Sequence, residues 1–358
     1  MENLETKFIV QNNYISKENI IVVFVITNNS NQDLYLLKWG TPLEGLKSDC
    51  LKITSRRNVQ IDYDGILLKR GQPGSDAFIK IKAKSSLKKE INLSLAYDLN
   101  SEDEYTIEFN SQNLVVVSPS SIKNHEFIST AEISNTSISE ISNNSSTFSV
   151  TESGEKNLTI GQLNRMDSKK KENNQVKSFP SISVIDPKLV GGTEAQRRKV
   201  KLAHTNGYSL MKQSIAKLRN DSSYKTWFGL YKEERFEKVK ATYSKIKYTL
   251  DSKVFTYNLS GEGCESDTYA YTTKGGGTIW LCDLFWKAPE TGINSKAGTI
   301  VHEHCHASAS LEDIIIGGIQ YYGQKLCKEL ALKYPDKSVQ NADNYEYYSE
   351  VEIKTYPF

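Results

Sequence analysis

The stretch that decides the fold of the second half of the chain is Ala297-Gly298-Thr299-Ile300-Val301-His302-Glu303-His304-Cys305-His306. An apolar run leads directly into the pattern His-Glu-x-x-His, and positions i and i+4 lie on one face of an α-helix. His302 and His306 can therefore aim two imidazoles at one metal ion, with Glu303 beside them. The chain has only five histidines, and three of them fall within this motif. The pattern predicts a helix that carries a zinc site.

A zinc site with an adjacent carboxylate is typical of peptide-bond hydrolysis. Bound zinc lowers the pKa of its water towards about 7 and polarises a carbonyl group, and Glu303 can accept the proton of that water. We therefore predict a zinc-dependent endopeptidase with one Zn²⁺ per chain and a protein or peptide substrate. His304 and Cys305 point to other faces of the helix, and we interpret them as packing residues.

The residues alone leave the third zinc ligand open. A catalytic zinc site needs a third protein ligand besides an open fourth position. No histidine follows His306, which excludes the longer motif His-Glu-x-x-His-x-x-Gly-x-x-His. Glu312 and Asp313 are the acidic residues close behind the motif, and either can supply a carboxylate oxygen.

Three blocks in order resemble one known family, the aspzincins, which include deuterolysin and the peptidyl-Lys metalloendopeptidases. They are residues 297–303, Tyr322-Gly323-Gln324, and Asn341-Ala342-Asp343-Asn344-Tyr345-Glu346-Tyr347-Tyr348. In that family a downstream Asp completes the zinc site, and the Tyr of the Tyr-Gly pair helps to stabilise the oxyanion. The resemblance implies Asp313 as the third ligand, with Glu312 as the alternative, and Tyr322 as the oxyanion-stabilising residue.

The chain departs from the family pattern at one point. Asp313 precedes Tyr322 by nine residues, whereas the family usually has the Asp only a few residues before Tyr-Gly. Cys264 and Cys282 match the usual cysteine pair of the family, which implies a disulfide. The spacing of the cysteines alone is compatible with this disulfide and equally with reduced, buried thiols.

Asp343 and Glu346 are three residues apart and share one face of a predicted helix. In the lysine-specific members of the family, the matching acids bind a lysine ammonium on the prime side of the cut. The resemblance therefore implies cleavage on the amino side of lysine. A solvated acidic face or a structural capping network is the alternative interpretation.

The chain reads as a multidomain protein. Residues 1–118 predict an all-β, immunoglobulin-like sandwich, because several short apolar runs alternate with period two between turn residues. These predicted strands are residues 20–26, 34–37, 78–81, 91–95 and 105–109. Parts of this region, residues 37–42 and 63–65 leading to Lys69-Arg70, also resemble the β-rich region that precedes many such protease domains.

Residues 119–185 are rich in Ser, Asn and Lys and predict a partly disordered linker. Residues 186–358 predict an α+β, zincin-type protease domain that is rich in helices and has a small sheet. The expected helices are residues 194–219, 232–249, 295–309, 321–334 and 337–355, and the expected strands are residues 254–257, 268–271 and 278–282.

Composition excludes several classes. Apolar residues make up 38% and charged residues 25%, with a net charge of +2, which does not indicate a nucleic-acid partner. No apolar run is long enough for a membrane span. The first residues lack the apolar core of a Sec signal. We therefore expect export by another route, as an effector or toxin, or otherwise a cytoplasmic protein.

Two other hypotheses remain at this point. In one, the chain is an inactive relative whose β-sandwich binds a protein partner or acts in adhesion. In the other, the sandwich is an inhibitory pro-domain, and the protease cuts the linker itself at Lys169 to Lys171 or at Lys177.

Overall fold

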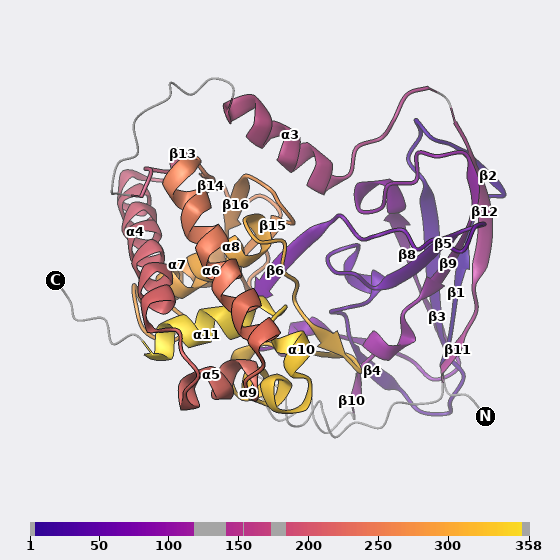
Figure 1. The fold of residues 1–358 in the computed structure, drawn as a ribbon. Helices are drawn as coiled ribbons and strands as arrows, with labels where there is room; N and C mark the ends of the chain where they lie inside the picture. Colours follow the sequence, from indigo (N-terminus) through magenta and orange to yellow (C-terminus); the bar gives the residue numbers. More distant parts are fainter. Residues whose placement is uncertain (1–3, 118–140, 153, 173–183, 353–358) are drawn as a thin grey trace. The chain divides into compact units, whose positions relative to one another are not determined.

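The computed structural model describes residues 4–117, 141–152, 154–172 and 184–352. It divides into two compact units (Figure 1). The first consists of Met1–Ile66, Gln72–Leu163 and Ile315–Ile319, and the second of Leu67–Gly71, Asn164–Ile314 and Gln320–Phe358.

The first unit is rich in strands, as predicted. Its sheets have the strand orders β11-β1-β3-β8, β10-β4-β7 and β2-β12-β9-β5. The strands are β1 (Leu4–Ile9), β2 (Asn13–Ile15), β3 (Ile21–Asn28), β4 (Leu34–Leu37), β5 (Leu51–Ser55), β7 (Phe78–Ile81), β8 (Ser86–Asn92), β9 (Asp103–Phe109), β10 (Val116–Val117), β11 (Ile141–Asn143) and β12 (Ser146–Thr151). The immunoglobulin-like arrangement of these sheets stays a prediction.

The core of this unit depends on alternating aromatic side chains. Phe24 of β3 is fully buried, and its ring lies 5.4 Å from that of Phe8 and 5.3 Å from that of Phe109. Phe8 lies on β1, which pairs with β3, whereas Phe109 lies on β9 of another sheet, so these tilted ring contacts join strands within one sheet and also join two sheets.

The linker interpretation of residues 119–185 differs from the structure in two places. Residues 141–151 form β11 and β12, and residues 160–172 form helix α3 (Ile160–Glu172). Strand β12 alternates with period two, since Phe148 and Val150 are buried and their neighbours are not. The polar composition of the surrounding segment favoured a linker over this short strand. Lys169 to Lys171 lie in α3, and Lys177 lies outside the described residues, as does about half of the predicted linker.

The second unit is α+β, as predicted. Its sheet has the order β13-β14-β16-β15-β6, in which β13, β14 and β16 run parallel and β15 is antiparallel to β16. Its strands are β6 (Ile66–Arg70), β13 (Lys188–Val190), β14 (Thr256–Asn258), β15 (Thr268–Thr273) and β16 (Thr278–Leu281). Strands β17 (Ile315–Ile316) and β18 (Ile319–Gln320) form a separate two-stranded sheet, of which residues 315–319 are grouped with the first unit. Its helices are α4 (Glu194–Lys217), α5 (Ser222–Phe228), α6 (Glu233–Ser252), α7 (Asp283–Lys287), α8 (Lys296–Ala307), α9 (Gly323–Lys333), α10 (Pro335–Ser338) and α11 (Ala342–Glu352).

Strand β6 was not predicted. It comes from residues far upstream of the other strands, yet it takes the place next to β15 at the edge of the second unit's sheet (Figure 1). The helices of the described residues include none that is long and apolar enough to cross a membrane.

Helix α8 lies inside this unit, and every one of its residues is buried. Two glycines let neighbouring helices approach it. A Cβ on Gly207 of α4 would lie 2.9 Å from a side-chain atom of Ile300, and a Cβ on Gly298 would lie 1.8 Å from the Glu350 carboxylate of α11. A helix that is enclosed on all sides can carry polar side chains only where other groups of the protein meet them.

A disulfide joins Cys264 and Cys282, the pair that the resemblance implied, and Cys50, Cys305 and Cys327 are free and buried. The loop it closes spans a sequence separation of 18 residues and contains the whole of β15 and β16. Closing such a loop restricts the unfolded chain.

We predict that Cys264→Ala with Cys282→Ala lowers the free energy of unfolding of the second unit by about 3 kcal/mol, the value expected for a loop of this length. Urea denaturation of the variant and the wild type measures the difference. A reducing agent should destabilise the wild type and leave the double variant unchanged. Equal stability of the oxidised wild type and the variant would contradict the prediction.

Candidate active site and metal centre

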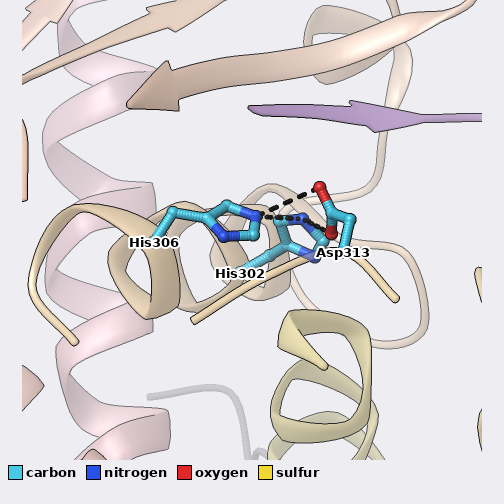
Figure 2. Close-up of side chains that lie close together, drawn as sticks. All are labelled: His302, His306 and Asp313. Atoms are coloured by element: carbon cyan, nitrogen blue, oxygen red, sulfur yellow. Dashed lines mark hydrogen bonds and ion pairs between the residues drawn. The ribbon is translucent and has the colours of Figure 1, made fainter. Parts of the chain in front are cut away.

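Helix α8 places the two motif histidines one turn apart. Its first residue follows Ser295, whose hydroxyl accepts a hydrogen bond from the backbone N–H of Gly298 at 2.9 Å and so caps the helix. His302 and His306 then lie on one face, and both rings point towards Asp313, which follows the helix (Figure 2).

The nitrogen and oxygen atoms of these three side chains converge. The Nε2 atoms of the two histidines are 3.1 Å apart, and each lies 3.4 Å from a carboxylate oxygen of Asp313. Two ligands at zinc–ligand distances of about 2.0–2.1 Å in a tetrahedral site lie about 3.3–3.4 Å from each other. The donor set therefore fits one zinc ion.

The opposite ring nitrogens indicate which tautomers are present. Nδ1 of His306 lies 2.9 Å from the carbonyl oxygen of Leu311, and Nδ1 of His302 lies 2.8 Å from Oδ1 of Asp343. Both neighbours are acceptors and favour a proton on each Nδ1, which would leave each Nε2 available to bind a metal ion. Two nitrogen atoms and a carboxylate that face one another favour a cation between them.

The electrostatics of the site also favour a cation. Burial opposes ionisation of Asp313, but His306 and His302 outweigh it and hold the pKa of that carboxyl well below its usual range. Burial and Lys69 act to lower the pKa of His302, yet Asp313 and Asp343 raise it well above its ordinary value. Positive charge is thus stabilised at this point.

A second group of donors, His302 with Asp343 and Glu346, also lies close together. The Nζ of Lys69 already occupies it, 3.2 Å from Oδ1 of Asp343 and in contact with Glu346. An ammonium group at this distance repels a metal ion, so the group of His302, His306 and Asp313 is the metal centre that the geometry favours.

Glu303 is fully buried beside the two histidines. Neither of its carboxylate oxygens has a hydrogen-bond partner among the described residues. Burial raises its pKa and the nearby His302 and His306 lower it, and the net result is a pKa of about 7. A carboxylate with this pKa and without a partner in the protein can accept a proton near neutral pH.

Tyr322 and the acidic pair lie close to His302. The Tyr322 hydroxyl donates a hydrogen bond to the carbonyl oxygen of Leu68, and its ring centroid is 6.1 Å from that of His302. Asp343 and Glu346 are buried at the start of α11 and both contact the Lys69 ammonium.

Comparison with known proteins identifies the family. The sequence profile described as lysine-specific metallo-endopeptidase, that of the aspzincins, matches residues 213–350. A peptidyl-Lys metalloendopeptidase from Pleurotus ostreatus is 30% identical over 170 residues, which cover 45% of this chain and 95% of the relative. The chain belongs to the aspzincin family.

Two further similarities cover different shares of the chain. An extracellular protease from Aeromonas hydrophila is 27% identical over 350 residues, covering 94% of this chain and 89% of the relative. A solved structure, a zinc peptidase from Grifola frondosa, shares 33% sequence identity over 45% of this chain and 98% of that chain, with a TM-score of 0.40.

The catalytic, metal-binding and acidic residues singled out from the sequence all lie in the second unit, around helix α8. His302, His306 and Asp313 converge, Glu303 lies beside them, and Tyr322 is near His302. Glu312, the alternative ligand, turns away, because its carboxylate accepts a hydrogen bond from Lys274 at 2.7 Å and is half exposed.

Two features were not foreseen. Asp343 contacts His302 as well as Lys69, so it belongs both to the metal centre's surroundings and to the acidic pair. Lys69 was quoted only within a resembling segment, and nothing local in the sequence signals that it reaches α11. Its ammonium also lies 5.3 Å from the ring centroid of Tyr269, within range for a cation–π contact.

We predict that Asp313→Asn removes most of the bound zinc, because a neutral amide is a poorer ligand than a carboxylate for this dication. The control is Glu312→Gln, which should keep about one zinc per chain. Metal content after dialysis, measured by elemental analysis, tests both. Full zinc in Asp313→Asn with loss in Glu312→Gln would reverse the assignment.

Proposed function

We propose that this aspzincin is an active zinc metalloendopeptidase that cleaves peptide bonds on the amino side of lysine. The observation that carries the proposal is the convergence of two Nε2 lone pairs and the Asp313 carboxylate beside the Glu303 carboxylate. His302, His306 and Asp313 would hold one Zn²⁺, which when bound supplies Lewis-acid chemistry and favours ionisation of water at neutral pH.

The protein's own groups have separate roles. Glu303 takes a proton from the attacking water and passes it to the amine that leaves when the C–N bond breaks. The Tyr322 hydroxyl donates a hydrogen bond to the carbonyl oxygen as negative charge develops there, and its contact with the Leu68 carbonyl supports that role. Burial excludes bulk water and strengthens these interactions.

Lysine specificity is supported by the acidic pair. Asp343 and Glu346 are buried and carry no solvent-exposed surface of note, so their negative charges need a partner. The Lys69 ammonium contacts both carboxylates, so the space between them can hold a lysine ammonium. The names of several relatives, such as peptidyl-Lys metalloendopeptidase, agree with this preference.

The alternative is a relative without activity whose N-terminal sheets, which we infer to be immunoglobulin-like, bind a partner. The intact set of His302, Glu303 and His306 argues against it. The Cys264–Cys282 disulfide supports an oxidising compartment and therefore export.

We predict that Glu303→Gln keeps zinc but lowers kcat/KM by about 10²- to 10⁴-fold, the usual contribution of a positioned general base. An amide cannot accept the proton of the attacking water. Extended digestion of a denatured protein, with product peptides counted by mass spectrometry, measures the loss, and elemental analysis confirms the metal. Wild-type rates in a zinc-loaded Glu303→Gln chain would disprove the mechanism.

We also predict that Glu346→Gln weakens the preference for lysine while zinc stays bound. Asp343→Asn should weaken both the lysine preference and the binding of zinc, because Asp343 lies 2.8 Å from Nδ1 of the proposed ligand His302. Cleavage sites in a peptide library, scored by mass spectrometry, give the preference. Glu329→Gln, on the exposed side of α9, is the matched control and should change neither. A library without lysine enrichment after the cut would refute the specificity and leave the metallopeptidase assignment intact.

A further inference from the structure

Helices α8 and α11 run antiparallel and are joined by polar contacts at two points. At one point, Nδ1 of His302 lies 2.8 Å from Oδ1 of Asp343. At the other, the carboxylate of Glu350 accepts hydrogen bonds from Ser295, the capping residue of α8. The two points are seven residues apart in both segments, which corresponds to about 10.5 Å along a helix axis. The two helices are thus held together at both ends of one shared face.

The hydrogen bonds of Glu350 come from donors at the start of α8. Its Oε1 accepts from the backbone N–H and the hydroxyl of Ser295 at 2.9 and 2.7 Å, and its Oε2 accepts from the backbone N–H of Asn294 at 2.9 Å. Tyr347, also on α11, donates its hydroxyl to Oδ1 of Asn294 at 2.5 Å. A carboxylate is stabilised near a helix N-terminus, where backbone dipoles favour negative charge. These contacts anchor the end of α11 to the start of the metal-binding helix.

The lack of a side chain at Gly298 permits this anchor. A Cβ there would lie 1.8 Å from Oε1 of Glu350 and 3.0 Å from Oε1 of Glu346. Ordinary contacts between carbon atoms and their neighbours are about 3.5–4.0 Å long, so even a methyl group would displace Glu350 from its donors. Gly298 therefore lets the backbone of α8 lie directly against two carboxylates of α11.

Glu346 lies between the two points at which the helices are joined. Its side chain is fully buried, and its Oε1 has no hydrogen-bond partner among the described residues. It is one of the two acids of α11 assigned to lysine recognition, whereas α8 carries the metal-binding histidines. A substrate must reach from the metal centre, where its carbonyl is attacked, to the acids of α11, where its ammonium binds. The separation of α8 and α11 must therefore match the length of the lysine side chain.

We propose that Glu350 is a positioning residue for lysine recognition, because its anchor to Ser295 and Asn294 fixes α11 at the distance from α8 that suits a side chain of lysine length. Gly298 is the second component of this device, since it provides the space for the anchor. The inference rests on the proposed function and deepens it. Glu350 does not have to touch the substrate, and it acts through the placement of Glu346 and Asp343.

The charge of Glu350 determines the conditions of the test. Burial and the neighbouring Glu346 raise the pKa of Glu350 to about 8, against the hydrogen bonds from Ser295, which lower it. At pH 9 the carboxyl group is therefore mostly ionised and can accept from all of its donors. A lysine ammonium, with an ordinary pKa of about 10.4, keeps its charge there.

The test uses three peptides at pH 9 that differ only in the residue after the cut, which is ornithine, lysine or homolysine. Their side chains differ by one methylene group each. We expect the kcat/KM of the wild type for lysine to exceed that for either neighbour at least about tenfold. Glu350→Gln should lower this ratio several-fold with zinc still bound, because an amide must present its NH₂ group to one of the donors. Glu329→Gln is the matched control, since its carboxylate pairs with Lys333 at the surface of α9, and it should keep the wild-type ratio.

Gly298→Ala tests the same anchor from α8 and should lower the ratio in the same way. Elemental analysis and urea denaturation establish that each variant is folded and holds zinc, and Glu350→Gln decides alone if Gly298→Ala does not fold. Wild-type ratios in zinc-loaded Glu350→Gln would overturn the proposal, as would an equal loss of kcat/KM on all three peptides, which indicates a structural role only. A wild type that cuts the three peptides equally well would instead refute the proposed lysine specificity, so the two failures are distinguishable.

Discussion

His302 connects the metal centre to the acidic pair, because its two ring nitrogens face different acidic groups. Nε2 points to His306 and Asp313, and Nδ1 lies 2.8 Å from Asp343. A carboxylate at the outer nitrogen fixes the tautomer and orients the ring towards the metal. Since Asp343 also contacts Lys69, the charge in the acidic pair and the orientation of a metal-binding ring depend on each other.

This arrangement has an electrostatic cost that the fold must offset. Glu303, Asp313, Asp343 and Glu346 are all buried or nearly so around one enclosed helix. Buried like charges destabilise one another unless cations lie between them. The Lys69 ammonium lies on one side of His302 and a bound metal ion would lie on the other, whereas burial raises the pKa of Glu303 to about 7. The residue proposed as the base is therefore the one without a resident partner.

Local patterns explain how much of the site could be predicted from the sequence. The spacing of His302 and His306 defines a helix face directly, while Asp313 required the family resemblance because Glu312 is equally close in sequence. The five longer helices of the protease unit, α4, α6, α8, α9 and α11, were predicted, whereas the short helices α5, α7 and α10 were not. Strand β6 could not be predicted, since its pairing with β15 joins residues about two hundred positions apart and leaves no local signal. Strands β11 and β12 were missed because polar composition outweighed their short alternation.

The terminal place of β6 in the sheet order has a topological consequence. Strands β13, β14, β16 and β15 pair with one another without it, so removing β6 breaks a single ladder and leaves the remaining sheet connected. The exposed side of β15 would then offer unpaired N–H and C=O groups, which bind extended chains and not helices. Such an edge discriminates by backbone conformation, so lysines in unfolded or extended segments would be accessible to it and lysines in intact helices would not.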